Sequence, residues 1–165
     1  MTTSSNLLFA ALALGVVTGM RSMLAPALVG RALARQDDID DAPEPAPLLA
    51  SRGAQRFFVP MAAAELLGDK MPFAPDRTIA PSMLVRALSG GVTAAALAGA
   101  RREPVWLAAL IGACAALVAS EVGLSLRKRY GSSGGLANAA LGLTEDCLAL
   151  TIANAGLRQA LGPRA

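Results

Sequence analysis

The chain has 165 residues, of which 54% are hydrophobic, 16% are charged and only 4% are aromatic. An ordinary soluble domain has roughly 25% charged residues, so this composition favours lipid as the solvent, with an Ala-rich soluble helical bundle as the alternative. The net charge of +3 is small and dispersed, which argues against a nucleic-acid surface. Histidine is absent, which removes the usual zinc ligand and the usual general base.

Apolar segments alternate with polar or Pro-rich stretches along the whole chain. The apolar segments cover residues 7–30, 57–67, 82–100, 104–126 and 136–157. Each approaches the roughly 20 residues that span a bilayer as a helix. Strand-like alternation is absent, and helices satisfy their own backbone hydrogen bonds in lipid. We therefore predict an all-α membrane protein, a single domain over residues 1–165, with about five transmembrane helices, some short or broken.

The first segment is interrupted by Arg21, which stands between Gly19 and Pro26 and marks a break in the helix. A signal peptide is the competing interpretation, but the first twenty residues contain no Lys or Arg, so we expect a retained membrane helix. Residues 31–52 follow, with five of the chain's twelve acidic residues and several prolines. This composition predicts a mobile acidic loop after the first span.

Small residues recur at four-residue spacing within the apolar segments, a pattern that lets helix backbones approach closely in lipid. The pairs are Gly15 with Gly19, Ala95 with Gly99, and Gly112 with Ala116. The two cysteines, Cys114 and Cys147, lie inside apolar runs and are expected to be small buried hydrophobic residues.

Basic residues near the segment ends give a weak prediction of orientation. For five spans, eight of them fall on one side and five on the other, which favours an N-terminus outside and a C-terminus inside. The eight are Arg31, Arg35, Arg52, Arg56, Arg101, Arg102, Arg158 and Arg164, and the five are Lys70, Arg77, Arg127, Lys128 and Arg129. A homo-oligomer, including a dual-topology homodimer, remains an alternative.

Ionisable residues inside the apolar segments are the most informative feature. They are Arg21, Glu65, Asp69, Lys70, Arg86, Glu121, Glu145 and Asp146. Glu145 and Asp146 near the centre of the last segment cost ~5–7 kcal/mol together on membrane-insertion scales, and the apolar residues of that segment recover only ~2–4 kcal/mol. These acids therefore need a cation, a proton, a metal ion or a watery cavity.

Glu65 and Asp69 are four residues apart and share one helix face. Together with Glu145 and Asp146 they could form an oxygen-rich cluster for a divalent cation such as magnesium, calcium or manganese. Arg21 is the natural counter-ion or anion ligand. The alternative for Lys70, Arg86 and Glu121 is that their side chains reach to the membrane edge, and Arg21 with Glu145 and Asp146 could instead be a purely structural ion-pair lock.

At these residues the sequence resembles the bacterial membrane-protein family catalogued as domain of unknown function 4126. The resemblance rests on residues 19–22 (Gly-Met-Arg-Ser), on residues 65–72 (Glu-Leu-Leu-Gly-Asp-Lys-Met-Pro), on Arg86, on Asn138 and on residues 145–149 (Glu-Asp-Cys-Leu-Ala). Two departures are Ser22, where the family pattern has Ala, and Ala139, where it has Pro. The resemblance implies a multi-span architecture in the inner membrane and no established activity.

The leading hypothesis is a small transporter or channel for an ion or a small polar solute. Glu65, Asp69, Glu145 and Asp146 would line its polar path, Arg21 and Lys70 would set its charge balance, and Asn138 would offer a hydrogen bond. The first alternative is a metal-dependent membrane enzyme acting on a phosphorylated lipid. The second is a structural or assembly subunit. The expected partners are the lipid bilayer and copies of the same chain, and no nucleic acid.

Overall fold

The computed structural model describes residues 4–68, 80–130 and 134–162, with side chains placed for residues 4–67, 81–126 and 142–162. Over these residues the chain forms helices and no strand, so the predicted all-α class is confirmed. The helices are α1 (Ser5–Met20), α2 (Leu24–Leu33), the 3-10 helix η1 (Ile39–Asp41), α3 (Ala46–Ala50), α4 (Arg52–Gly68), α5 (Ala80–Ala100), α6 (Val105–Tyr130) and α7 (Gly134–Leu161).

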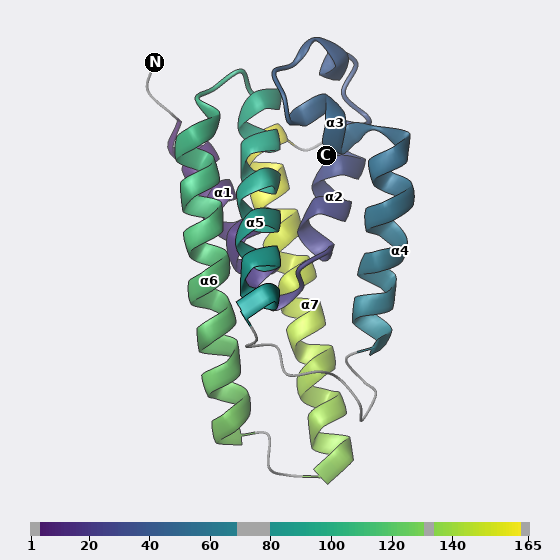
Figure 1. The fold of residues 1–165 in the computed structure, drawn as a ribbon, viewed down its shortest axis with the longest axis vertical. Coiled ribbons are helices and arrows are strands. Elements are labelled where there is room, and N and C mark those ends of the chain that lie inside the picture. The colour runs from purple at the N-terminus through teal and green to yellow at the C-terminus, as the bar shows by residue number, and fades with distance from the viewer. Residues whose placement is uncertain (1–3, 69–79, 131–133, 163–165) are drawn as a thin grey trace.

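The first apolar segment is a hairpin of two helices and not one span. α1 ends at Met20, Arg21 is extended with φ −140°, and α2 begins at Leu24. Figure 1 shows α2 returning alongside α1 toward the end where the chain began. The break was predicted, but the apolar run carries no information about the angle between its two halves. The reversal follows from an extended residue at the break and Pro26 in the first turn of α2, where its missing N–H costs no helical hydrogen bond.

The two ends of the described chain lie at the same end of the bundle, which we call the terminal end. Near the start of α1, Asn6 accepts a hydrogen bond from Gln159 of α7 at 2.9 Å. Glu103, in the turn between α5 and α6, accepts hydrogen bonds from the Ser4 amide and hydroxyl at 2.7 and 2.9 Å. Five parallel or antiparallel spans would place these two ends at opposite ends of the bundle, and the α1–α2 hairpin adds the reversal that brings them together. The orientation in a membrane remains a prediction.

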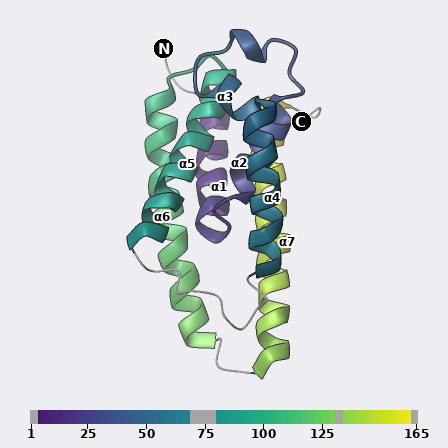
Figure 2. The same cartoon turned by 45° about the vertical axis from the view of Figure 1, so that its right-hand side comes forward.

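The predicted loop over residues 31–52 contains η1 and α3 near the terminal end (Figure 2). Its aspartates are exposed, whereas Ile39, Ala46 and Leu49 are buried. These apolar residues tie the segment to the bundle. Its mobility remains a prediction.

Helix α1 is the centre of the bundle and packs against α5, α6 and α7. A Cβ atom placed on Gly15 would lie 2.5 Å from the carbonyl oxygen of Gly112, and one on Gly19 would lie 2.5 Å from that of Ala116. Only glycine permits this approach of α1 to α6. The predicted close packing through small residues is confirmed at these positions.

The outer surface of the bundle is apolar. Large exposed hydrophobic residues run along the outward face of α6, and others lie on α1, α4, α5 and α7. On α6 they are Trp106, Leu110, Val118, Val122 and Leu126. Cys114 and Cys147 are also exposed. The prediction that they are buried is wrong, because each side chain lies on the outer surface of the bundle.

Two of the described helices, over Pro81–Ala100 and Val105–Leu126, are long and apolar enough to cross a membrane. α1 and α2 are apolar but shorter. The apolar window of α6 is only 22% buried inside the bundle, against 56% for that of α5. The core helix of a soluble protein would be mostly buried, so α6 is not the core helix of this bundle.

Candidate functional site

The polar side chains of the helices gather at the break between α1 and α2. We call this set the polar layer; its members are Arg21, Ser22, Glu65, Arg86, Ser89, Ser120, Glu145 and Asp146. At about 1.5 Å per residue, the charged members on α4, α5 and α7 and the end of α1 lie about 20–24 Å from the terminal end, and Ser89 lies about 17 Å from it. α6 and α7 continue beyond this level (Figure 1). Charged groups therefore meet deep inside an apolar bundle.

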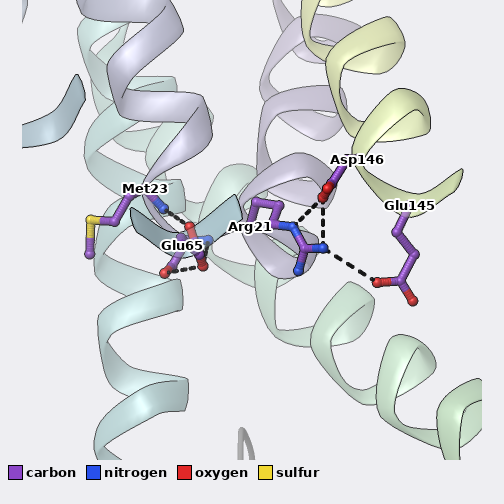
Figure 3. Close-up of polar contacts among 6 residues, drawn as sticks. Arg21, Met23, Glu65, Glu145 and Asp146 are labelled. Carbon is purple, nitrogen blue, oxygen red and sulfur yellow. Dashed lines mark hydrogen bonds and ion pairs between the residues drawn. The ribbon is translucent and has the colours of Figure 1, made fainter. Parts of the chain in front are cut away.

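Arg21 is the most buried charged residue of the layer, with 1% of its surface exposed. Its Nε donates a hydrogen bond to Oδ1 of Asp146 on α7 at 2.7 Å, and its Nη2 forms an ion pair with the same oxygen at 2.6 Å. Nη2 also lies 3.9 Å from Oε2 of Glu145 (Figure 3). Asp146 is buried, whereas the Glu145 side chain is 21% exposed. Of the two α7 carboxylates beside Arg21, Asp146 is therefore the closer and more buried, and Glu145 the more distant and more accessible.

The Arg21 guanidinium lies beside two consecutive residues of α7, Glu145 and Asp146, so both carboxylates can reach it. Charge-assisted hydrogen bonds of this length are about twice as strong as neutral ones. Inside a low-dielectric bundle, the pairing offsets the desolvation of both ions. The predicted role of Arg21 as counter-ion to Glu145 and Asp146 agrees with this geometry.

Glu65 lies on the other side of the break and makes a different kind of contact. Its Oε1 accepts hydrogen bonds from the Ser22 amide at 2.7 Å and the Ser22 hydroxyl at 2.8 Å. Its Oε2 accepts from the Met23 amide at 2.9 Å (Figure 3). These amides precede the first turn of α2, where N–H groups have no helical partner and the helix dipole favours an anion. Glu65 thus caps α2 from another helix.

The carbonyl groups at the break are also satisfied by side chains from neighbouring helices. Arg86 of α5 donates through Nη1 to the Gly19 carbonyl oxygen. The Ser120 hydroxyl of α6 also lies within hydrogen-bond distance of that oxygen, at 3.2 Å, while its shorter bond is to the Ala116 carbonyl of its own helix, at 2.7 Å. The Ser89 hydroxyl donates to the Ser22 carbonyl oxygen at 2.6 Å. A helix can break in lipid only where its freed backbone groups find such partners, so α4, α5 and α6 together stabilise the break.

The structure brings together five of the eight predicted site residues: Arg21, Glu65, Arg86, Glu145 and Asp146. Asp69 and Lys70 lie outside the described residues, as does the side chain of Asn138. The interpretation of Arg86 as a membrane-edge anchor is wrong, because its side chain is 5% exposed and turns inward to the Gly19 carbonyl. Glu121 is exposed on α6, as a side chain reaching for the membrane edge would be.

Sequence reasoning missed the roles of three serines in the polar layer. Ser22 was noted only as a departure from the family pattern, and Ser89 and Ser120 were not noted at all. Ser89 stands three residues after Arg86, and so on the same face of α5, which is the one sequence signal that pointed to it. Single serines in apolar helices otherwise carry no distinguishing pattern.

The described carboxylates do not fit the predicted divalent-cation site. Within the ranges that have placed side chains, no three Asp, Glu or Cys residues lie close enough together to hold a metal ion. Both oxygens of Glu65 accept hydrogen bonds from the amides of Ser22 and Met23, just before α2. The Asp146 carboxylate is paired with the Arg21 guanidinium. Because Asp69 is outside the described residues, the four-carboxylate cluster as a whole remains a prediction.

Comparison with known proteins gives one finding. The model of a family described as a domain of unknown function, DUF4126, matches residues 8–159. No curated protein and no solved structure matches the chain. The matched range contains every member of the polar layer.

Proposed function

The chain belongs to the DUF4126 family, and because that family's description assigns no activity, we propose a function from the site itself. We propose that it is a multi-pass membrane protein and that an ion or a small polar solute crosses the membrane through its polar layer. The observation that carries the proposal is the buried Arg21–Asp146 pair at a helix break, inside a bundle with an apolar outer surface.

Support for the membrane comes from the distribution of polarity. Large apolar side chains cover the outside of α6, while Arg21, Arg86 and Asp146 are buried. A soluble protein has the opposite arrangement, because burying a charge is costly and exposing a continuous apolar face favours aggregation. In lipid, the same arrangement buries the charges against one another and exposes the apolar surface to acyl chains.

For topology, we propose four crossing helices, α4 to α7, and an α1–α2 hairpin that enters from the terminal end and turns at the polar layer. Among the residues with placed side chains, the exposed arginines lie near that end: Arg31, Arg35, Arg52, Arg56, Arg101, Arg102 and Arg158. These seven outnumber the three basic residues at the far end of α6, Arg127, Lys128 and Arg129. Basic residues flank the cytoplasmic ends of membrane helices. The terminal end, with both termini, would then face the cytoplasm of a cell whose inner membrane holds the protein.

For permeation, the support is the combination of a broken helix with intramembrane charge. Broken helices in transporters expose backbone groups near the middle of the membrane, where solutes bind, and intramembrane ionisable residues commonly mark ion or proton pathways. Glu145 is the carboxylate best suited to meet a solute, because it is more exposed than Asp146 and lies farther from Arg21.

The test is solute flux into liposomes that contain the purified protein, measured over a panel of monovalent cations, small anions and protons. We expect flux for at least one of them, and we expect Glu145→Gln to abolish it. Glu121→Gln is the matched control: it neutralises an exposed carboxylate on α6 outside the polar layer and should leave flux unchanged. Absence of flux over the whole panel would sink the proposal, and so would equal loss in both variants.

The structural subunit is the second candidate, and a specific observation favours it. Glu65 and Arg86 bind backbone groups of the break and need no solute to account for them. If these contacts serve packing alone, neutralising any charge of the polar layer lowers stability without changing flux. The metal-dependent lipid enzyme gains no such support, because Arg21, its proposed phosphate ligand, is held by Asp146.

A further inference from the structure

Helix α4 is attached to the bundle differently from the other long helices. It packs mainly against α2 and the short α3 and lies at the outer edge of the bundle (Figure 1). Phe57, Val59, Met61 and Leu67 of α4 are all exposed. Few buried apolar contacts make an element easy to displace, so the position of α4 depends on a small number of specific contacts.

Among the described residues, the side-chain hydrogen bonds from α4 to other helices lie at two points, with the buried Ala62 between them. In the half of α4 before Pro60, the Gln55 side chain donates a hydrogen bond to the Leu49 carbonyl oxygen at 3.1 Å. This contact lies next to Gly30. A Cβ atom on Gly30 would lie 2.5 Å from that same oxygen, so α2 and α3 meet closely there. In the lower half, the contact is Glu65, with its three hydrogen bonds to Ser22 and Met23.

Pro60 stands midway between these two points, inside α4. Proline has no N–H, so the helical hydrogen bond to the Arg56 carbonyl cannot form, and the ring favours a bend at this place. Pro60 lies five residues after Gln55 and five residues before Glu65. The half of α4 beyond Pro60 can therefore move while the half before it stays in place.

We propose that α4 from Pro60 to Gly68 is a gate over the polar layer and that Glu65 is its latch. When the Glu65 carboxylate leaves Ser22 and Met23, this half of α4 swings outward and uncovers the break beside Arg21. The released donors then bond to water or to the oxygen atoms of a passing solute. As a regulation of passage, the gate rests on the proposed function, although its movement can be measured without any flux.

The test is a pair of spin-label distances in the purified full chain, with Cys114 and Cys147 replaced by alanine. Leu88→Cys on α5 is the fixed point. It is paired with Leu67→Cys for the lower half of α4, or with Phe57→Cys for the upper half; all three side chains are exposed. We expect Glu65→Gln to give the 67–88 distance a second, longer population and to leave the 57–88 distance unchanged.

Three results would overturn the gate: an unchanged 67–88 distance in Glu65→Gln, an equal shift of both distances, or the same shift in the control variant Glu121→Gln. If Glu65→Gln does not fold, Ser22→Ala removes one of the three bonds and should give a smaller second population; an unchanged distance there would equally overturn the proposal. A second population without flux would keep the gate and contradict the permeation function instead.

Discussion

Helices α1 and α4 both bring charge to the polar layer, but they are held in opposite ways. α1 lies in the centre, packs against three helices and is followed by an arginine that pairs with a formal negative charge. α4 lies at the edge and ends near a carboxylate that binds only neutral backbone and hydroxyl donors. The comparison indicates that one side of the break is fixed by packing and ion pairing, and the other by a few hydrogen bonds.

The largest expected effect is on the α1 side, from Asp146→Asn. It removes the short, buried carboxylate that pairs with the Arg21 cation. Breaking a buried ion pair from one side costs about 3–5 kcal/mol of unfolding free energy. The measurement is the equilibrium unfolding of the purified protein in detergent as a denaturing detergent is added.

The matched control for this prediction removes both charges. Arg21→Met combined with Asp146→Leu should recover most of the lost stability, because neither ion is then left unpaired. A loss of less than about 1 kcal/mol in Asp146→Asn would contradict the buried pair, since only exposed pairs are that weak.

On the α4 side, Glu65→Gln should cost about 1.5–3 kcal/mol, the range for hydrogen bonds to a charged group. The glutamine can still accept from Ser22, but its amide nitrogen faces the Met23 N–H and cannot accept from it. The same detergent titration measures the loss. Glu121→Gln should show no loss, and equal losses in the two variants would mean that Glu65 is not a specific cap.

The long helices could be predicted from the sequence because their ends are marked locally. The predicted segment at 82–100 became α5 (Ala80–Ala100), and the one at 104–126 became α6 (Val105–Tyr130). Arg101 and Arg102 separate these helices, and Pro104 precedes the second. An exposed charged pair followed closely by a proline marks a helix boundary in the sequence itself, so this turn could be located without the fold.

The hairpin and the details of the polar layer could not be predicted in this way. Gly19 and Pro26 mark a break, but the direction of α2 depends on contacts with α3 and α4. Arg86 turns inward because a carbonyl on another helix needs a donor. The sequence shows which side chains are charged, but not which backbone groups a break releases, so Glu65 was expected to meet other carboxylates and instead meets amides.

A smaller effect tests the packing of α1 itself. In Gly15→Ala, the new methyl group would lie 2.5 Å from the Gly112 carbonyl oxygen and 2.6 Å from the Ala115 side chain. Both neighbours are short or part of the backbone, so the helices must separate, at a cost of about 1–3 kcal/mol. Gly123→Ala on α6 is the control: nothing lies within 4 Å of its Cβ position, and it should gain about 0.5–1 kcal/mol as a better helix former.

The smallest effect on stability is expected for Glu145→Gln, at less than about 1 kcal/mol, because a pair at this distance with a partly exposed partner is weak. The same change should abolish flux. Asp146→Asn, by contrast, should lose stability and flux together, since it disturbs the fold around Arg21. Measuring both quantities in both variants separates a residue that a solute meets from a residue that holds the helices. Loss of stability in Glu145→Gln as large as in Asp146→Asn would place both carboxylates in the structural lock.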